Sequence, residues 1–302
     1  MRALRYTEYG GPDVLTVEEA PEPHAGPGEV RVRVRAASVN PIDTKLRSGA
    51  MGGDPAALPR VPGVDAAGVV DEVGPGVDGV AVGDEVLGIG SATAAEQAVL
   101  SMWTAKPASM SWPEAAALAL GAETAARALD LLGVGEGTTV LVDGAAGGVG
   151  SAAVQLAVAR GATVIGTASE RNHDFLRRLG ALPTTYGAGL VERVREMTPG
   201  GVDAALDTAG KGSVPDLVRL VAEPSQVVSI ADFSASEHGA RVTSGNEGRA
   251  DYALAEAVRL HGEGRYAVEV ERTFPLAEGA EAHRVSEAGH VRGKLVLVVD
   301  EG

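Results

Sequence analysis

Two kinds of hydrophobic pattern alternate along the chain and predict two kinds of architecture. Over the first hundred residues, apolar and polar positions alternate in short runs that Gly and Pro separate, most clearly from Val30 to Val34. This pattern is typical of closely spaced strands with one buried face and predicts a small rolled β-barrel. The run 2–20 is predicted to be a hairpin, broken at Gly10, Gly11 and Pro12.

The middle of the chain changes period. An Ala- and Leu-rich helix is predicted from Trp112 to about Leu132, with Ser111 as its N-cap and Pro113 in its first turn. Apolar strands alternating with helices follow, and this alternation predicts a parallel, doubly wound sheet. The strands are expected within 138–144, 162–169, 202–210 and 225–231.

The tail returns to helix, strand, helix and strand, and the simplest topology adds it to the first lobe. The predicted fold class is therefore α/β, with a β-barrel domain over 1–108 and 248–302 and a doubly wound domain over 109–247.

Composition narrows the function classes. The 302 residues include 41 acidic and 26 basic side chains, a formal charge of −15, which disfavours nucleic acid or an anionic membrane as the main partner. No apolar run approaches the roughly 20 residues of a membrane span. Without a secretion signal at the N-terminus, a cytoplasmic location is expected. The chain has no cysteine, so thiolate catalysis and Cys-ligated zinc are excluded, and no metal site is predicted.

The stretch from Gly144 to Gly150 is the most informative motif. It follows the apolar strand residues 140–142 and precedes an apolar helix, which is the context of a dinucleotide-binding turn. Free N–H groups at the helix start can receive a pyrophosphate if no Cβ blocks the approach. The predicted cofactor-binding residues of this turn are Gly144, Ala146, Gly147, Gly148, Val149 and Gly150.

The end of the following strand indicates which cofactor is preferred. NAD sites usually place an acid there, about 20 residues after the glycines, to hold the ribose 2′-hydroxyl. Here the strand is expected to end at Thr167 or Ala168, and Ser169 and Arg171 offer a hydroxyl and a guanidinium instead. Both can donate hydrogen bonds to a 2′-phosphate, so NADPH is predicted over NADH. A one-residue shift would present Glu170 and weaken this prediction.

Several ordered motifs resemble the medium-chain dehydrogenase/reductase superfamily, and within it the zinc-free quinone oxidoreductase branch that includes zeta-crystallin. The resemblance covers nearly the whole chain. The segments that carry it are 37–43, 62–68, 83–86, the turn 144–150, and 274–294 with Gly293-Lys294 near its end.

The resemblance implies a GroES-like barrel completed by the C-terminal segment, an inserted Rossmann domain, and NADPH in the cleft between them. By position, Asn40 is expected at the nicotinamide and substrate, Thr124 near the nicotinamide ring, and Tyr186 beside the 2′-phosphate. Asp43 and Asp65 are either catalytic carboxylates or acceptors for buried backbone groups, and the second role is favoured. Relatives are often dimers, so a homodimer is expected.

These observations predict a zinc-independent, NADPH-dependent oxidoreductase that transfers a hydride to a quinone or another electron-poor small molecule. Asn40 and Thr124 are the predicted catalytic residues. One alternative is reduction of an activated C=C bond, although the tyrosine that enoyl thioester reductases carry after the Asn segment is missing from residues 47–51. A second alternative is a non-catalytic NADPH-binding protein.

Overall fold

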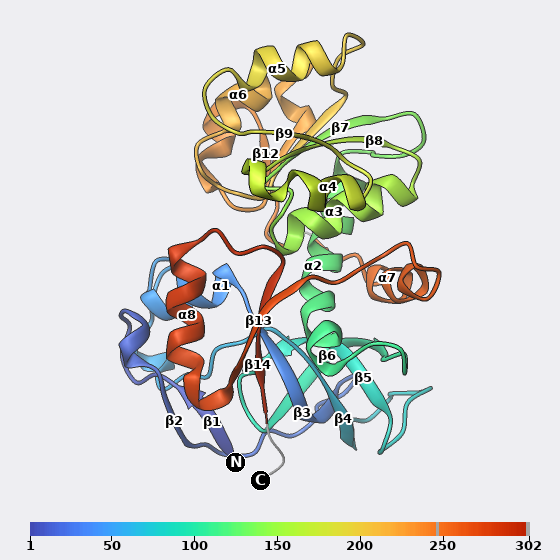
Figure 1. Ribbon diagram of the computed structural model, residues 1–302. Coiled ribbons are helices and arrows are strands. Elements are labelled where there is room, and N and C mark those ends of the chain that lie inside the picture. The colour runs from blue at the N-terminus through green and yellow to red at the C-terminus, as the bar shows by residue number, and fades with distance from the viewer. Residues whose placement is uncertain (246–247, 300–302) are drawn as a thin grey trace. The chain divides into compact units, whose positions relative to one another are not determined.

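Two six-stranded sheets of different kinds organise the chain in the computed structural model, which describes residues 1–245 and 248–299 (Figure 1). Contacts divide the chain into two units. The barrel unit comprises residues 1–120 and 268–302, and the Rossmann unit comprises residues 121–267.

The barrel unit is built around a ring of four antiparallel strands. β3 pairs with β4, β4 with β5, β5 with β6, and β6 again with β3. These strands are β3 (Val30–Val39), β4 (Asp65–Val73), β5 (Glu85–Ser91) and β6 (Gln97–Ala105). The Val side chains of β3 point into the core, and Arg31 points out to Asp71, as the alternating pattern predicts.

The long strand β3 pairs with β4 along one edge and with two further strands in turn along the other edge. Its first half, Val30–Arg33, pairs with β6, whereas Ala36–Val39 pairs antiparallel with β14 (Lys294–Val298). The strand β13 (Val270–Pro275) runs parallel to β14, and helix α8 (Gly279–Ala288) joins them. The predicted hairpin is confirmed as β1 (Arg2–Arg5) and β2 (Thr16–Glu19). Helix α1 (Pro41–Ser48) follows β3 directly, so Asn40 is its N-cap.

The Rossmann unit contains a six-stranded sheet in the order β12-β11-β10-β7-β8-β9, in which every pair is parallel. The order runs outward from β7 in both directions, as in doubly wound dinucleotide-binding folds. The strands are β7 (Thr139–Asp143), β8 (Thr163–Thr167), β9 (Leu182–Thr184), β10 (Ala204–Asp207), β11 (Val227–Ser229) and β12 (Arg241–Val242). The predicted fold class is confirmed.

Four helices of the described chain connect strands of this sheet, and two further helices lie before its first strand and after its last strand. They are α2 (Trp112–Leu131), α3 (Gly148–Ala159), α4 (His173–Arg178), α5 (Leu190–Met197), α6 (Val214–Val218) and α7 (Ala253–Gly262). One side of the sheet buries Leu141 and Ile165 against Val191 and Val194 of α5 and Leu217 of α6. Ser111 accepts from the Glu114 N–H and the Glu114 carboxylate accepts from the Ser111 N–H, so the predicted start of α2 has a capping box.

The unit boundaries lie later in the chain than the predicted domain boundaries. The first falls inside α2, after Leu120, rather than at residue 108. Residues 248–267 join the Rossmann unit because they bond to it: the Tyr252 hydroxyl donates to Asp130 (2.7 Å) and the Ala267 N–H donates to Gln155 (2.7 Å). The predicted boundary at residue 247 and the last three residues of the chain lie outside the described residues. Within the described ranges, no helix combines the length and hydropathy needed to cross a bilayer.

Candidate functional site

The glycine-rich turn joins β7 to α3 at the point where the strand order of the Rossmann sheet reverses. β8 lies on one side of β7 and β10 on the other, and ligands of such sheets bind at the carboxyl ends of the strands beside this point. Gly147 is the N-cap of α3 and has no side chain to occupy the first N–H groups of the helix. Those groups lie at the positive end of the helix dipole, so they suit a pyrophosphate.

Each of the three spaced glycines has a separate physical reason. Gly144 adopts φ +75°, which L side chains rarely adopt. A Cβ on Gly150 would lie 2.2 Å from the Gly144 carbonyl oxygen, so only glycine lets the helix pack on the turn. A Cβ on Gly147 would meet only that same oxygen, at 3.4 Å. Gly147 is therefore not required by packing, and its bare backbone leaves room for a ligand.

Two buried carboxylates support this turn from the ends of β7 and β10. Asp143 accepts hydrogen bonds from Thr167 and from Ser213 (2.6 Å), and burial raises its pKa above the usual range. Asp207 accepts from the N–H groups of Ala209 and Gly210, both at 2.9 Å. Both carboxylates are thus committed to holding loops in place.

The end of β8 carries no acid, as predicted. The strand ends at Thr167, Ser169 is half-buried, and Glu170 and Arg171 are exposed in the short turn that follows. Tyr186 lies two residues beyond Thr184, which pairs with Thr167 across β8 and β9. The two segments therefore leave neighbouring strands at the same edge of the sheet.

Arg193 of α5 fixes the segment that carries Tyr186. Its guanidinium donates to the carbonyl oxygens of Thr185 and Ala188, both at 2.8 Å. The Tyr186 side chain is itself 55% exposed. It is therefore available to a ligand at this edge while its backbone is held.

Asn40 lies in the barrel unit at the centre of a buried polar cluster. Its Nδ2 donates to Asp65 Oδ1 (2.7 Å) and, at longer range, to Ser38 Oγ (3.3 Å), and its Oδ1 accepts from Lys294 Nζ. Its backbone N–H donates to Asp43 Oδ2 (2.8 Å). Both ends of the Asn40 amide are therefore engaged within the barrel unit, a constraint that the sequence did not indicate.

The carboxylates of this cluster have mainly structural partners. Asp43 accepts from the N–H groups of Asn40 and Gly63, which confirms the favoured backbone role. Burial raises the pKa of Asp43 to about 7, and the nearby carboxylate of Asp65 adds to the shift. Asp65 accepts from Ser38, Asn40 and the backbone of Leu120.

Lys294 is the member that the sequence analysis missed. Its Nζ lies 3.7 Å from Asp65 Oδ2 as well as against Asn40, and the residue is 8% exposed. The motif Gly293-Lys294 was visible in the sequence as part of the C-terminal block. No role followed from it, because Lys294 and Asn40 are far apart along the chain.

Thr124 lies in the Rossmann unit and is buried beside an ion pair. Its hydroxyl donates to Glu123 Oε2 (3.3 Å), and Arg127 Nε donates to Glu123 Oε1 (2.9 Å). Arg127 also donates to Thr243, and the Ala250 N–H donates to Glu123 (3.4 Å). This ion pair therefore ties helix α2 to the chain on both sides of residues 246–247.

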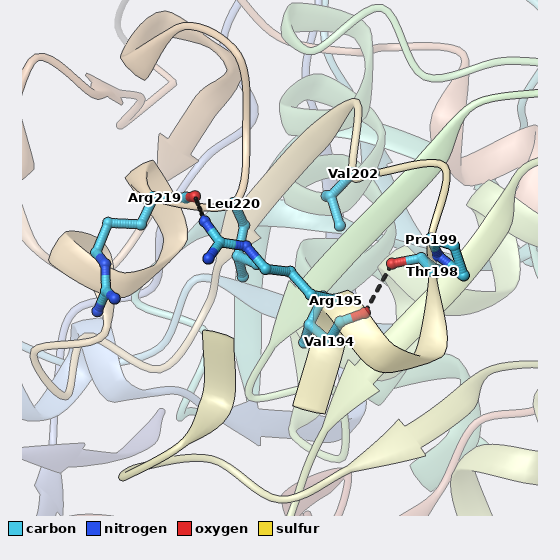
Figure 2. Close-up of a pocket in the computed structure, with 8 residues that line it drawn as sticks. Val194, Arg195, Thr198, Pro199, Val202, Arg219 and Leu220 are labelled. Carbon is cyan, nitrogen blue, oxygen red and sulfur yellow. Dashed lines mark hydrogen bonds between the residues drawn. The ribbon is translucent and has the colours of Figure 1, made fainter. Parts of the chain in front are cut away.

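A separate hollow of about 360 Å³ lies between α5 and α6 (Figure 2). It is beside Val202, which precedes β10, and so lies at the amino ends of the strands rather than at the carboxyl ends where dinucleotides bind. Arg195 donates to the Arg219 carbonyl oxygen across it (3.1 Å). It is not the cofactor site. No three His, Cys, Asp or Glu side chains of the described chain gather in a metal-binding arrangement.

Comparisons with known proteins agree with this fold. Residues 26–127 match the alcohol dehydrogenase GroES-like domain, and residues 183–297 match the family described as zinc-binding dehydrogenase. The chain is 32% identical to 2-methylene-furan-3-one reductase of Solanum lycopersicum, over 98% of this chain and 79% of that protein.

Two solved structures extend the likeness to the fold. The quinone oxidoreductase of Coxiella burnetii is 32% identical, with a TM-score of 0.83 and 99% of both chains covered. A mycobacterial protein solved in complex with NADPH is 29% identical, with a TM-score of 0.84 over 99% of this chain and all of that one.

Proposed function

The chain belongs to the medium-chain dehydrogenase/reductase superfamily of oxidoreductases, and we propose that it is a zinc-independent enzyme that uses NADPH to reduce a quinone or a similar electron-poor acceptor. One observation carries the proposal. The N-terminus of α3 stands at the carboxyl end of β7 with a bare Gly147, whose Cβ would meet only one protein atom within 4 Å. Packing within the protein does not require a glycine at this position, whereas a bound pyrophosphate would need the space that a side chain fills.

The Rossmann unit supplies the cofactor contacts in this proposal. The N–H groups at Gly148, Val149 and Gly150 begin α3 and would receive the pyrophosphate. Ser169 and Arg171 would donate to the 2′-phosphate. Tyr186 would lie beside that phosphate, and Thr124 beside the nicotinamide ring.

The bound nicotinamide would supply the hydride, and the barrel unit would orient the acceptor. Asn40 is the proposed centre of this surface, because it is buried, polar and held from several directions. A fixed polar group costs no reorganisation when charge develops on the acceptor oxygen. When the acceptor is a quinone, that oxygen can take its proton from solvent. The hydroxyl group that forms is acidic, so its deprotonated form is stable enough to wait for the proton.

Stopped-flow oxidation of NADPH by quinones, enones and aldehydes tests this proposal. We expect rapid oxidation by at least one quinone, a marked preference for NADPH over NADH in fluorescence titration, and a slower reaction for Asn40→Ala. Equal affinity for the two nucleotides, or an unchanged Asn40→Ala variant, would contradict the assignments of Arg171 or Asn40 respectively.

Reduction of an activated C=C bond is the second candidate, and one structural feature favours it. Hydride addition to one carbon must be followed by a proton on its neighbour, and a nearby acid helps that step. The Lys294 ammonium, which lies against Asn40, is the proton donor in this cluster that holds no backbone group in place. Faster turnover of enones than of quinones, with a solvent deuterium isotope effect, would favour this reaction.

A non-catalytic NADPH-binding protein is the third candidate. Tight NADPH binding without oxidation by any acceptor of the panel would support it. We also propose a homodimer, which light scattering on the purified protein would test directly.

A further inference from the structure

Lys294 occupies an unusual place for a lysine. It is the first residue of β14, and the pairing of Leu295 with Val39 places it next to Asn40 at the end of β3. Only 8% of the residue is exposed. Burying an ammonium group is costly unless it is paired and hydrogen bonded, so its partners are informative.

The partners of Lys294 define the orientation of one amide. The ammonium group can only donate, and it donates to Asn40 Oδ1. The Asp65 carboxylate can only accept, and it accepts from Asn40 Nδ2 at 2.7 Å. A flipped amide would turn its NH₂ group toward the ammonium and its oxygen toward the carboxylate, and both contacts would be repulsive.

The two charges of the cluster also need each other. Lys294 Nζ lies 3.7 Å from Asp65 Oδ2, and the Asp65 side chain is completely buried. Ser38 and the Leu120 N–H satisfy further positions on the same carboxylate. Removing Lys294 alone therefore leaves a buried carboxylate without its counter-charge and leaves the Asn40 oxygen without its donor.

We propose that Lys294 is a positioning residue that, with Asp65, fixes the Asn40 amide in one orientation for the acceptor. The effect of this orientation on the reaction rate rests on the proposed hydride transfer. The orientation of the amide itself does not depend on the proposed function. A preorganised polar group loses its value when it can rotate, and small misplacements of such groups cost up to about 10²-fold in rate.

The test compares three variants of the full chain. Lys294→Met removes the ammonium and keeps most of the apolar stem. Lys106→Met is the matched control: that lysine is also in the barrel unit, its side chain is 6% exposed, and it pairs with Glu85 outside the cluster. The double variant Asp65→Asn/Lys294→Met removes both buried charges, so it separates the loss of charge balance from the loss of orientation.

The first readout does not need activity. The chain has only three asparagines and three glutamines, so the Asn40 side-chain amide can be assigned by NMR with single substitutions. We expect this amide to exchange slowly with solvent in the wild type, to shift and exchange faster in Lys294→Met, and to be unchanged in Lys106→Met. An Asn40 amide that is unchanged in Lys294→Met would overturn the proposal, whether or not any acceptor is turned over.

The second readout is single-turnover hydride transfer at saturating NADPH. We expect a loss of tenfold or more in Lys294→Met, wild-type rates in Lys106→Met, and, in the double variant, recovered resistance to urea without a recovered rate. A wild-type rate in the double variant would show that Lys294 serves only to neutralise the charge of Asp65, and would contradict its role in orienting Asn40. A loss confined to NADPH affinity would assign Lys294 to the cofactor instead. If none of the acceptors tested is reduced by the wild type and NADPH, the proposed function fails. The NMR measurement on the Asn40 amide still decides the role of Lys294 in that case.

Discussion

Gly147→Ala is expected to separate cofactor binding from folding at the glycine-rich turn. An alanine Cβ at this position would meet only the Gly144 oxygen, at 3.4 Å, which is an ordinary contact. Its backbone, with φ −78° and ψ 176°, is one that alanine adopts freely. The same Cβ would stand where a pyrophosphate must approach the first N–H groups of α3. We therefore expect a folded protein that binds NADPH poorly.

The expected magnitudes differ clearly between the two properties. Alanine is a poorer N-cap than glycine by about 0.5–1 kcal/mol, but it also lowers the entropy of the unfolded chain by a comparable 0.4–1 kcal/mol, so stability changes little. Losing one or two charge-assisted hydrogen bonds to phosphate costs about 1.5–3 kcal/mol each. NADPH should therefore bind at least roughly tenfold more weakly.

Two further glycines are the controls. Gly150→Ala places a Cβ 2.2 Å from the Gly144 oxygen, and overpacking of this kind costs about 1–3 kcal/mol, so it should lower the urea midpoint. Gly200→Ala has open space around its Cβ and should change neither property. Fluorescence titration with NADPH and urea unfolding are measured on all three variants. Wild-type NADPH affinity in Gly147→Ala would refute the role of this turn.

Three further predictions concern charge. Arg171→Ala should weaken NADPH roughly 10- to 100-fold and leave NADH unchanged, as measured by fluorescence titration, because a charge-assisted bond to the 2′-phosphate is lost. Burial and the nearby positive charge of Arg47 lower the pKa of His283 to about 4. Burial raises the pKa of Asp43 to about 7. Between pH 4 and 6.5, unfolding takes up a proton at His283, so this group makes the free energy of unfolding rise with pH. Between pH 3.8 and 7, unfolding releases a proton from Asp43, so this group makes the free energy of unfolding fall with pH. Each effect is on the order of 3–4 kcal/mol. His283→Gln should make the free energy of unfolding fall, relative to wild type, as the pH rises from 4 to 7, and Asp43→Asn should make it rise; parallel urea profiles for all three proteins would contradict both pKa shifts. Glu123→Gln leaves the buried Arg127 charge unpaired and should cost about 3–5 kcal/mol in urea unfolding, and a double variant with both charges removed should be more stable than this single variant.

The sequence determined most of the Rossmann unit because its signals are local. Hydrophobic period distinguished its strands from its helices, and the glycine spacing from Gly144 to Gly150 lies within seven consecutive residues. The hydrogen bonds and steric limits of such a motif involve only its own few residues, so it can be recognised in the sequence without the tertiary structure. The end of β8 without an acid was also visible, because one strand and its following turn decide it.

Element lengths and boundaries were less well determined. The strand β3 was expected around the Val–Arg alternation of Val30–Val34, but the sequence did not indicate that Ala36–Val39 would pair with β14, which arrives from the other end of the chain. Residues 248–267 were assigned to the barrel lobe, yet hydrogen bonds of Tyr252 and Ala267 attach them to the Rossmann unit. Long-range partners decided both cases.

The sequence by itself determined that a glycine-rich turn joins a buried strand to an apolar helix and that no cysteine can hold zinc. Only the tertiary structure decided what surrounds Asn40. Lys294 and Asp65 reach it across strand pairings that bring distant residues together, and a buried charge is stable only where such pairings supply its partners. Local pattern can locate a polar residue in the chain, whereas the folded sheet determines which charges it meets.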